Sequence, residues 1–218
     1  MLKRFIGTVG LILAGATLAQ AAEMHAVVRD HKGLLVADAV VLAVPVDPRS
    51  ALHARPPKDA VDQVDKQFVP YVKAIFVGST VRFPNSDNIR HQVYSFSPAK
   101  KFELPLYSGT DAPPIVFDKP GVVVLGCNIH DWMIGYIYVS ETPFFAKTGP
   151  LGTAVISDMP AGEYRVRIWH PSMDHAEETT GQQVTLTADA PASAEWQIRL
   201  KPNIRVPRVS GAASPAYP

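Results

Sequence analysis

Short runs of β-branched and aromatic residues alternate with turn signals along most of the chain, and this pattern restricts the fold more than any other feature. In residues 164–169 the apolar side chains occupy every second position, as in a strand with one buried and one solvated face. Turn sequences such as 84–87 and 160–162 separate the runs, and no long stretch has the periodicity of a helix. The sequence therefore predicts an all-β protein built as a β-sandwich. The predicted strands cover residues 24–29, 36–44, 72–76, 80–83, 92–96, 114–117, 122–125, 134–139, 154–157, 164–169, 184–188 and 194–200.

The N-terminal segment has the composition of a secretory signal peptide. Lys3 and Arg4 form a basic start, residues 5–18 form an apolar run, and Ala19-Gln20-Ala21 fits a signal-peptidase site. Because the apolar run is shorter than a bilayer span requires, we expect residues 1–21 to be cleaved and the chain to have no stable membrane insertion. The protein is then expected to be periplasmic or secreted.

The composition excludes one class of partner and leaves one unusual residue. The 218 residues carry a formal net charge of +1, and no basic run is interleaved with aromatic residues, so no nucleic-acid partner is expected. The chain has one cysteine, Cys127, which rules out an internal disulfide. A lone cysteine in an exported protein is buried and inert, part of an intermolecular bridge, catalytic, or bound to a metal.

A seven-residue segment between two predicted strands favours the metal among these alternatives. Cys127, His130 and Met133 supply a thiolate, an imidazole and a thioether at C-x2-H-x2-M spacing. Soft sulfur donors with imidazole suit copper as Cu(I) or Cu(II), and the thioether favours copper over zinc. His91, at the start of another predicted strand, is the expected second imidazole. The predicted ligand set is Cys127, His91 and His130, with Met133 as a weak axial ligand, as in blue-copper electron-transfer centres.

Two segments of the sequence resemble the cupredoxin family. The loop 127–133 is similar to the C-terminal ligand loop of cupredoxins, with the length of amicyanin-like members, and residues 81–93 are similar to the family's strand-turn-histidine segment. The resemblance covers about residues 61–142. It implies a Greek-key β-sandwich that holds one copper ion and carries single electrons between larger redox proteins. It also implies that Asn85 supports the ligands by pinning the ligand loop.

The segments on either side of this block resemble a second kind of domain. Residues 24–46 and 160–166 are similar to the opening and closing strands of Ig-like, carboxypeptidase-regulatory-like β-sandwiches, which implies a split sandwich around the copper block. The combination also resembles exported methylamine-utilisation-like proteins. The predicted organisation is a signal peptide (1–21), the first part of the flanking sandwich plus a linker (22–60), a copper domain (61–142), the second part of the flanking sandwich (143–200) and a flexible tail (201–218).

Several of these residues also have a plain structural interpretation. Cys127 taken alone would be a small buried hydrophobic residue, and Met133 could pack in the core at the start of a strand. Trp132, like Asp131, departs from the simplest cupredoxin loops, and it either belongs to a docking patch or caps the end of the sandwich. The other candidate side chains are expected to be solvated: Glu103, Asp131, His170 and His175.

The function predicted from the sequence is that of an exported mononuclear type 1 (blue) copper protein that carries one electron through Cu(II) and Cu(I). Its expected partner is a redox protein, either a cytochrome or a dehydrogenase. An enzyme is not expected, because a copper oxidase or reductase needs a second copper centre and the remaining histidines are not clustered. The alternative is a periplasmic copper-binding or carrier protein without redox turnover. A third hypothesis is a structural protein that the metal stabilises.

Overall fold

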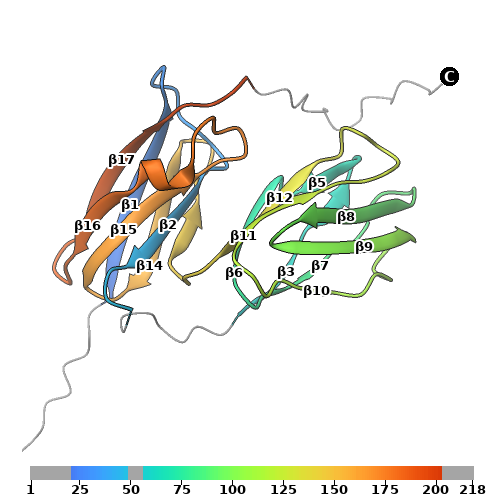
Figure 1. Ribbon diagram of the computed structural model, residues 1–218, viewed down its shortest axis with the longest axis horizontal. Helices are drawn as coiled ribbons and strands as arrows, with labels where there is room; N and C mark the ends of the chain where they lie inside the picture. Colours follow the sequence, from blue (N-terminus) through green and yellow to red (C-terminus); the bar gives the residue numbers. More distant parts are fainter. Residues whose placement is uncertain (1–20, 49–55, 203–218) are drawn as a thin grey trace, which may run out of the picture.

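The computed structural model describes residues 21–48 and 56–202, which form two bodies of β-sheet lying side by side (Figure 1). Apart from the short 3-10 helix η2 (Glu177–Thr180), the regular elements of these residues are strands, so the predicted all-β class is confirmed. No helix of this part of the chain is long and apolar enough to cross a bilayer. The predicted signal peptide, and all of the predicted tail except residues 201 and 202, lie outside the described residues, as does residue range 49–55.

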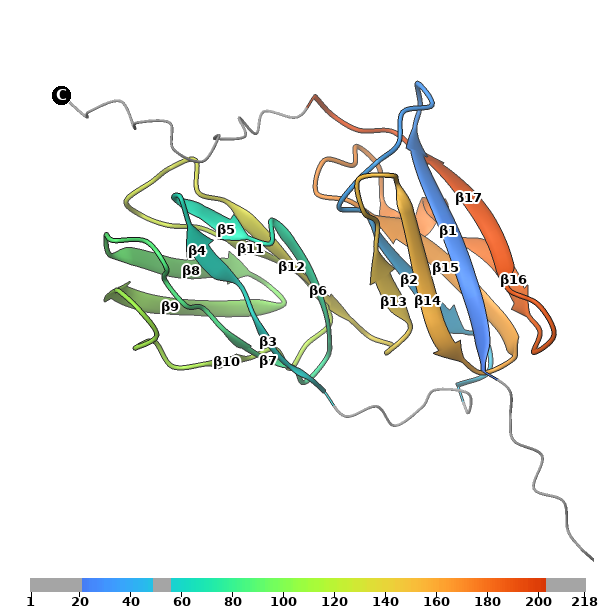
Figure 2. The same cartoon turned by 180° about the vertical axis from the view of Figure 1, so that it is seen from behind.

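The first body, which we call the flanking sandwich, combines strands from both ends of the chain (Figures 1 and 2). One of its sheets has the strand order β14-β1-β17 and the other has the order β13-β2-β15-β16. Met24, Ile168 and Trp196 are among the apolar side chains buried between them. The strands are β1 (Ala22–Asp30), β2 (Val40–Pro45), β13 (Phe145–Lys147), β14 (Thr153–Met159), β15 (Gly162–Trp169), β16 (Gln182–Leu186) and β17 (Ala192–Ile198). The likeness of this body to carboxypeptidase-regulatory-like domains stays a prediction.

The second body, the central sandwich, is formed by the chain between β2 and β13. Its sheets have the orders β10-β7-β3 and β11-β12-β6, and two hairpins, β4-β5 and β8-β9, complete it. Phe83, Phe117 and Ile137 lie in its core. The strands are β3 (Lys58–Ala60), β4 (Asp62–Val64), β5 (Gln67–Val69), β6 (Val72–Phe76), β7 (Thr80–Arg82), β8 (His91–Ser97), β9 (Lys100–Tyr107), β10 (Ile115–Val116), β11 (Gly121–Leu125) and β12 (Gly135–Ser140).

Two strands with continuous apolar sequence join the bodies, because both of their faces are buried. On β12, Ile137 points into the core of the central sandwich, whereas Tyr138 packs in a separate apolar cluster with Leu42 of β2. The Tyr138 ring lies 5.4 Å from that of Trp169, centroid to centroid, and its hydroxyl donates a 2.8 Å hydrogen bond to Glu177. Alternating side chains of one strand thus serve a core and an interface.

Five strands were not predicted, and their sequences explain why. β3, β4, β5 and β13 have only three residues each, and β3 lies in the stretch predicted as linker. β9 contains Lys100, Lys101 and Pro105, but it pairs only with β8, and the edge of a sheet tolerates lysine and proline. One predicted strand is shorter at its start than expected. The strand predicted at 36–44 corresponds to β2, which begins at Val40, because Asp38 has a φ angle of 60° that interrupts the extended backbone.

Candidate metal centre

The site begins where β11 ends, and a tight contact between two strands places Cys127 there. Gly126 and Tyr94 of β8 exchange two backbone hydrogen bonds, of 3.0 and 3.1 Å. A Cβ atom on residue 126 would lie 2.6 Å from Cζ of Tyr94, so a larger residue here would have to displace the Tyr94 ring. The bridge fixes the end of β11 beside the middle of β8, and Cys127, the next residue, lies beside His91 at the start of that strand.

The sulfur of Cys127 and the imidazole of His91 are spaced as two ligands of one ion would be. Sγ lies 3.8 Å from Nδ1 of His91. Metal–sulfur and metal–nitrogen bonds of about 2.3 and 2.0 Å, at a trigonal angle, separate the two donor atoms by about 3.7 Å. One ligand atom from each of Cys127, His91 and His130 lies within 4.8 Å of the others. These three are the only metal-ligating cluster of this kind among residues 21–48 and 56–202.

The loop after Cys127 folds back on itself and carries the other two predicted ligands. A backbone hydrogen bond of 2.8 Å from Met133 to the carbonyl of His130 closes the turn. The His130 ring centroid lies 5.0 Å from that of His91. Met133 belongs to the same buried cluster as Cys127 and lines the same cavity. The structure thus gathers all four predicted side chains at one end of the central sandwich, each of them at most 8% exposed.

The surroundings of Cys127 favour its thiolate form. Burial by itself would raise the pKa of the thiol, but hydrogen bonds from His91 and from the backbone N–H groups of Ile129, Gln92 and His130 outweigh it and hold the pKa below its ordinary value. Burial would likewise lower the pKa of His91, but hydrogen bonds with Cys127 and Asp87 outweigh it and raise the pKa. The thiolate is the form that binds metals, so the protein prepares this ligand before any metal arrives.

Asn85 supports the turn that leads to His91. Its side-chain amide donates to the carbonyls of Ile89 and Tyr107, both at 2.9 Å, and its oxygen accepts the N–H of Asp87 at 3.0 Å. These bonds fix the turn that leads to His91 and tie it to β9. These contacts reach the histidine's own turn and β9, and the predicted role of Asn85 in pinning the ligand loop stays a prediction.

Asp87 is the residue at the site that sequence reasoning missed. Its Oδ2 lies 2.7 Å from Nε2 of His91, which leaves the Nδ1 edge facing Cys127. The available signal was a carboxylate four residues before a candidate ligand, on the same turn. Such spacing is common in turns without a metal, so it does not stand out in a sequence.

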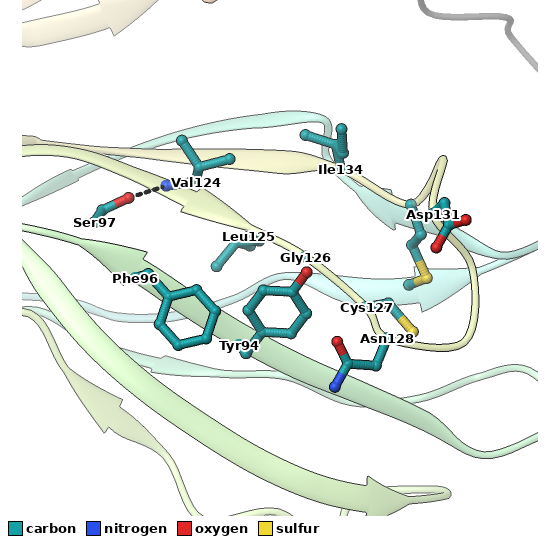
Figure 3. Close-up of a pocket in the computed structure, with 11 residues that line it drawn as sticks. Tyr94, Phe96, Ser97, Val124, Leu125, Gly126, Cys127, Asn128, Asp131 and Ile134 are labelled. Carbon is teal, nitrogen blue, oxygen red and sulfur yellow. Dashed lines mark hydrogen bonds between the residues drawn. The ribbon is translucent and has the colours of Figure 1, made fainter.

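An open cavity of about 490 Å³ runs along β8 and β11 and ends at the metal centre. Figure 3 shows Phe96 and Val124 along the cavity, and Cys127 and Asp131 at the end formed by the ligand loop. Asp131 is exposed and is not part of the ligand cluster. The cavity lining is mostly apolar around a few polar groups, as in many small-molecule sites.

The remaining candidates lie outside the cluster. Trp132 is 38% exposed, and its ring centroid lies 5.1 Å from that of His130. Glu103 is engaged with the side-chain amide of Gln92 at 2.5 Å. His170 accepts the N–H of Ser172, and His175 lies beside Asp174, both in the flanking sandwich; burial lowers the pKa of His170, which is more enclosed than predicted.

Comparison with solved structures finds similarity to copper proteins over part of the chain. The Cu-containing nitrite reductase from Thermus scotoductus SA-01 is 31% identical over 45% of this chain, with a TM-score of 0.37, and the match spans 27% of the reductase. A purple cupredoxin from Nitrosopumilus maritimus is 26% identical over 38% of this chain and 99% of its own, with a TM-score of 0.34. An amicyanin variant is 17% identical over 47% of this chain and 99% of its own, with a TM-score of 0.35.

The structure neighbours are thus cupredoxins, the family that the ligand loop resembles. No protein-family model matches the chain, and no curated protein matches it. The similarity to these three structures covers less than half of the chain.

The donor set fits a copper ion. Two imidazoles, a thiolate and a nearby thioether are the ligand types of a copper site that serves both oxidation states, and the measured spacing of sulfur and nitrogen suits one ion. His91, Cys127 and His130 would hold the ion, with Met133 beside them.

Proposed function

We propose that this protein is an exported type 1 copper protein that carries one electron at a time between redox partners. The observation that carries the proposal is the convergence of Cys127, His91 and His130 donor atoms within 4.8 Å at a buried site. Copper bound there would supply a one-electron Cu(II)/Cu(I) couple. Electron transfer without bond making needs ligands that move little, and burial together with the hydrogen bonds around Cys127 and His91 provides that restraint.

The ligand loop offers the route by which an electron would reach the site. His130 is nearly buried, and the ring of Trp132 packs beside it while remaining 38% exposed. Ile129 and Ile134 are also exposed on this loop or directly after it. We propose this apolar end as the contact surface for a cytochrome or a dehydrogenase, since exposed apolar groups near a functional site commonly mark interaction surfaces.

The first test is the visible spectrum of the protein loaded with Cu(II). Thiolate bound to Cu(II) gives an intense charge-transfer absorption, which we expect in the wild type and expect to vanish in Cys127→Ser. His170→Gln is the matched control, because it removes an imidazole that lies outside the cluster, and its spectrum should equal that of the wild type. A colourless wild type with bound copper, or a coloured Cys127→Ser variant, contradicts the proposal.

A copper carrier without redox turnover is the second candidate, and the open cavity beside Cys127 and Met133 favours it by giving solvent a path to the site. It predicts rapid transfer of copper to a chelator and no electron exchange with redox proteins. Stopped-flow oxidation of the Cu(I) form by a cytochrome separates the two candidates. We propose that the protein carries electrons or copper rather than catalysing a reaction, because the described residues contain one ligand cluster of this kind.

We propose export on the basis of the signal-like composition of residues 1–21, and this proposal can be tested without copper. Fractionation of the producing cells, with N-terminal sequencing of the mature chain, should give a protein outside the cytoplasm that begins near Ala22. A cytoplasmic chain that retains Met1 contradicts this part of the proposal.

A further inference from the structure

The carboxylate of Asp87 is surrounded by three N–H donors from two different segments. Oδ1 accepts the backbone N–H of Asp65 at 2.7 Å, and Oδ2 accepts the backbone N–H of Lys66 at 2.9 Å. Oδ2 also lies 2.7 Å from Nε2 of His91. The side chain is only 13% exposed, so both oxygens are held in one orientation by the protein rather than by solvent.

The two backbone donors come from a turn whose shape is well suited to hold an anion. Asp65 and Lys66 join β4 to β5, and both have positive φ angles, of 52° and 59°. Two residues of this kind form the tight hairpin turn, and their successive N–H groups face the same side. Asp87 accepts both of these N–H groups, so the hairpin β4-β5 holds the carboxylate whose Oδ2 also contacts His91.

The orientation of Asp87 determines which nitrogen of His91 is available. A carboxylate accepts hydrogen bonds, so Nε2 carries a proton, and Nδ1, 3.8 Å from Sγ of Cys127, is the nitrogen that would give up its proton to a bound ion. A carboxylate also places a full negative charge one imidazole ring away from the ion, which a neutral acceptor would not. That charge favours the more positive Cu(II) over Cu(I).

We propose that Asp87 is a positioning residue that fixes His91 as an Nδ1 ligand and, through its charge, sets the preference of the site for Cu(II) over Cu(I). The second half of this proposal depends on the proposed copper function, whereas the first half does not. The competing explanation is that Asp87 only ties the hairpin β4-β5 to the turn before His91.

The variant Asp87→Asn tests both halves, because an amide has one oxygen for three donors that approach two oxygen positions. We expect Cu(II) affinity to fall about 10–100-fold, as for other residues that orient metal ligands, and Cu(I) affinity to fall by a clearly smaller factor. Dissociation constants for the two ions, from competition with chelators of known affinity, give the two factors. Equal losses for both ions, or no loss, overturn the charge effect.

Asp62→Asn is the matched control. Asp62 lies in the same hairpin and accepts hydrogen bonds from Ser86 and Gln63, so its replacement removes the same charge and perturbs the same turn, whereas the carboxylate against His91 is that of Asp87. We expect its ratio of Cu(II) to Cu(I) affinity to stay within about twofold of the wild type, because the Asp62 carboxylate is not the one that lies against His91 and is partly screened by solvent. A ratio that falls as far as in Asp87→Asn means that the charge acts without His91.

A measurement on the wild type keeps the proposal testable if Asp87→Asn does not fold. Zn(II) also binds cysteine and histidine ligands and gives sharp NMR spectra. In the Zn(II)-loaded wild type we expect the Nε2 proton of His91 to exchange slowly with water, and the metal to be bound at Nδ1. Metal at Nε2 overturns the positioning role even if the copper function is correct. If the copper function fails, this result still decides the role of Asp87.

Discussion

The flanking and central sandwiches have apolar cores of similar make-up, but among the buried residues described only the central one also encloses histidine and cysteine side chains. Trp196, Ile168 and Met24 pack in the flanking core. The central core adds His91 and Cys127 to residues of the same apolar kind. Buried polar groups destabilise a fold unless they are paired, and here Asp87 pairs with His91 and backbone N–H groups pair with Cys127. Among the described residues, the cluster of side chains that could hold a metal ion thus lies in the central sandwich.

The contact between the two sandwiches is separate from the metal centre. Leu42, Val72 and Tyr138 form an apolar cluster of their own, and Tyr138 belongs to the strand that follows the ligand loop. The opposite face of the same strand belongs to the core that contains Cys127. Changes in the flanking core should therefore alter the stability of the protein and leave the metal centre unchanged.

The largest expected effect tests this separation in the flanking core. Trp196→Ala removes a side chain that is 2% exposed, together with its hydrogen bond to the carbonyl of Thr180, and should lower the free energy of unfolding by about 3–5 kcal/mol. The Cu(II) spectrum of the folded fraction should not change. Urea denaturation followed by tyrosine and tryptophan fluorescence, with the visible spectrum recorded in parallel, checks both statements.

Ile168→Val keeps this comparison testable if Trp196→Ala is too unstable to purify. Its side chain is fully buried in the same core, and the loss of one methylene should cost about 0.5–1.5 kcal/mol. A shifted charge-transfer band in either variant would mean that the flanking core helps to shape the metal centre.

An intermediate effect is expected from a methyl group placed in the central sandwich. In Gly126→Ala the new Cβ would lie 2.6 Å from the Tyr94 ring, so we expect a loss of about 1–3 kcal/mol and a changed copper spectrum, because residue 126 directly precedes Cys127. Adding Tyr94→Ala should relieve the clash, so that the costs of the two substitutions are not additive. Urea unfolding and visible absorption are the measurements.

Gly149→Ala is the matched control in the flanking half of the chain. An added Cβ at residue 149 meets no atom within 4 Å, so the change in unfolding free energy should stay within about 0.5 kcal/mol. If Gly126→Ala is as mild as this control, the close approach of β8 and β11 does not constrain the position of Cys127.

The smallest expected effect is a pH dependence of the free energy of unfolding that arises from Glu177, at the interface between the sandwiches. Burial raises the pKa of Glu177, although its hydrogen bond with Tyr138 and the charge of Arg167 oppose the shift. The folded state therefore binds this proton more tightly than the unfolded state. The carboxyl group's contribution to stability is complete below its ordinary pKa and is lost as the pH rises through its raised value in the fold. The wild type should thus lose stability relative to Glu177→Gln as the pH rises above about 4, the ordinary pKa of a glutamate.

Urea unfolding of the two proteins at several pH values measures this difference. Tyr138→Phe sharpens the test, because it removes a hydrogen bond that lowers the pKa of Glu177 and should make the loss with rising pH steeper. A difference between wild type and Glu177→Gln that does not vary with pH would contradict the burial of an ionisable carboxyl group at the interface.

Local sequence was sufficient to predict most strands and the loop that carries the donors. The strand predicted at 72–76 matches β6, because its apolar and β-branched residues are confined to a pairing segment between turns. The hairpin β4-β5 was missed, since three-residue strands with polar side chains have no detectable periodicity. β9 was missed because an edge strand tolerates lysine and proline.

The sequence by itself determined the all-β class and the types of donor on the loop 127–133, because periodicity and spacing are local properties of the chain. Only the tertiary structure decided that His91, distant in sequence, lies 3.8 Å from Cys127, since the bridge between Gly126 and Tyr94 joins their strands. It also decided that Asp87 faces the far nitrogen of His91 and that Asn85 fixes the histidine's turn. Such contacts depend on how distant strands pair, and short polar residues satisfy many pairings equally well until the fold selects one.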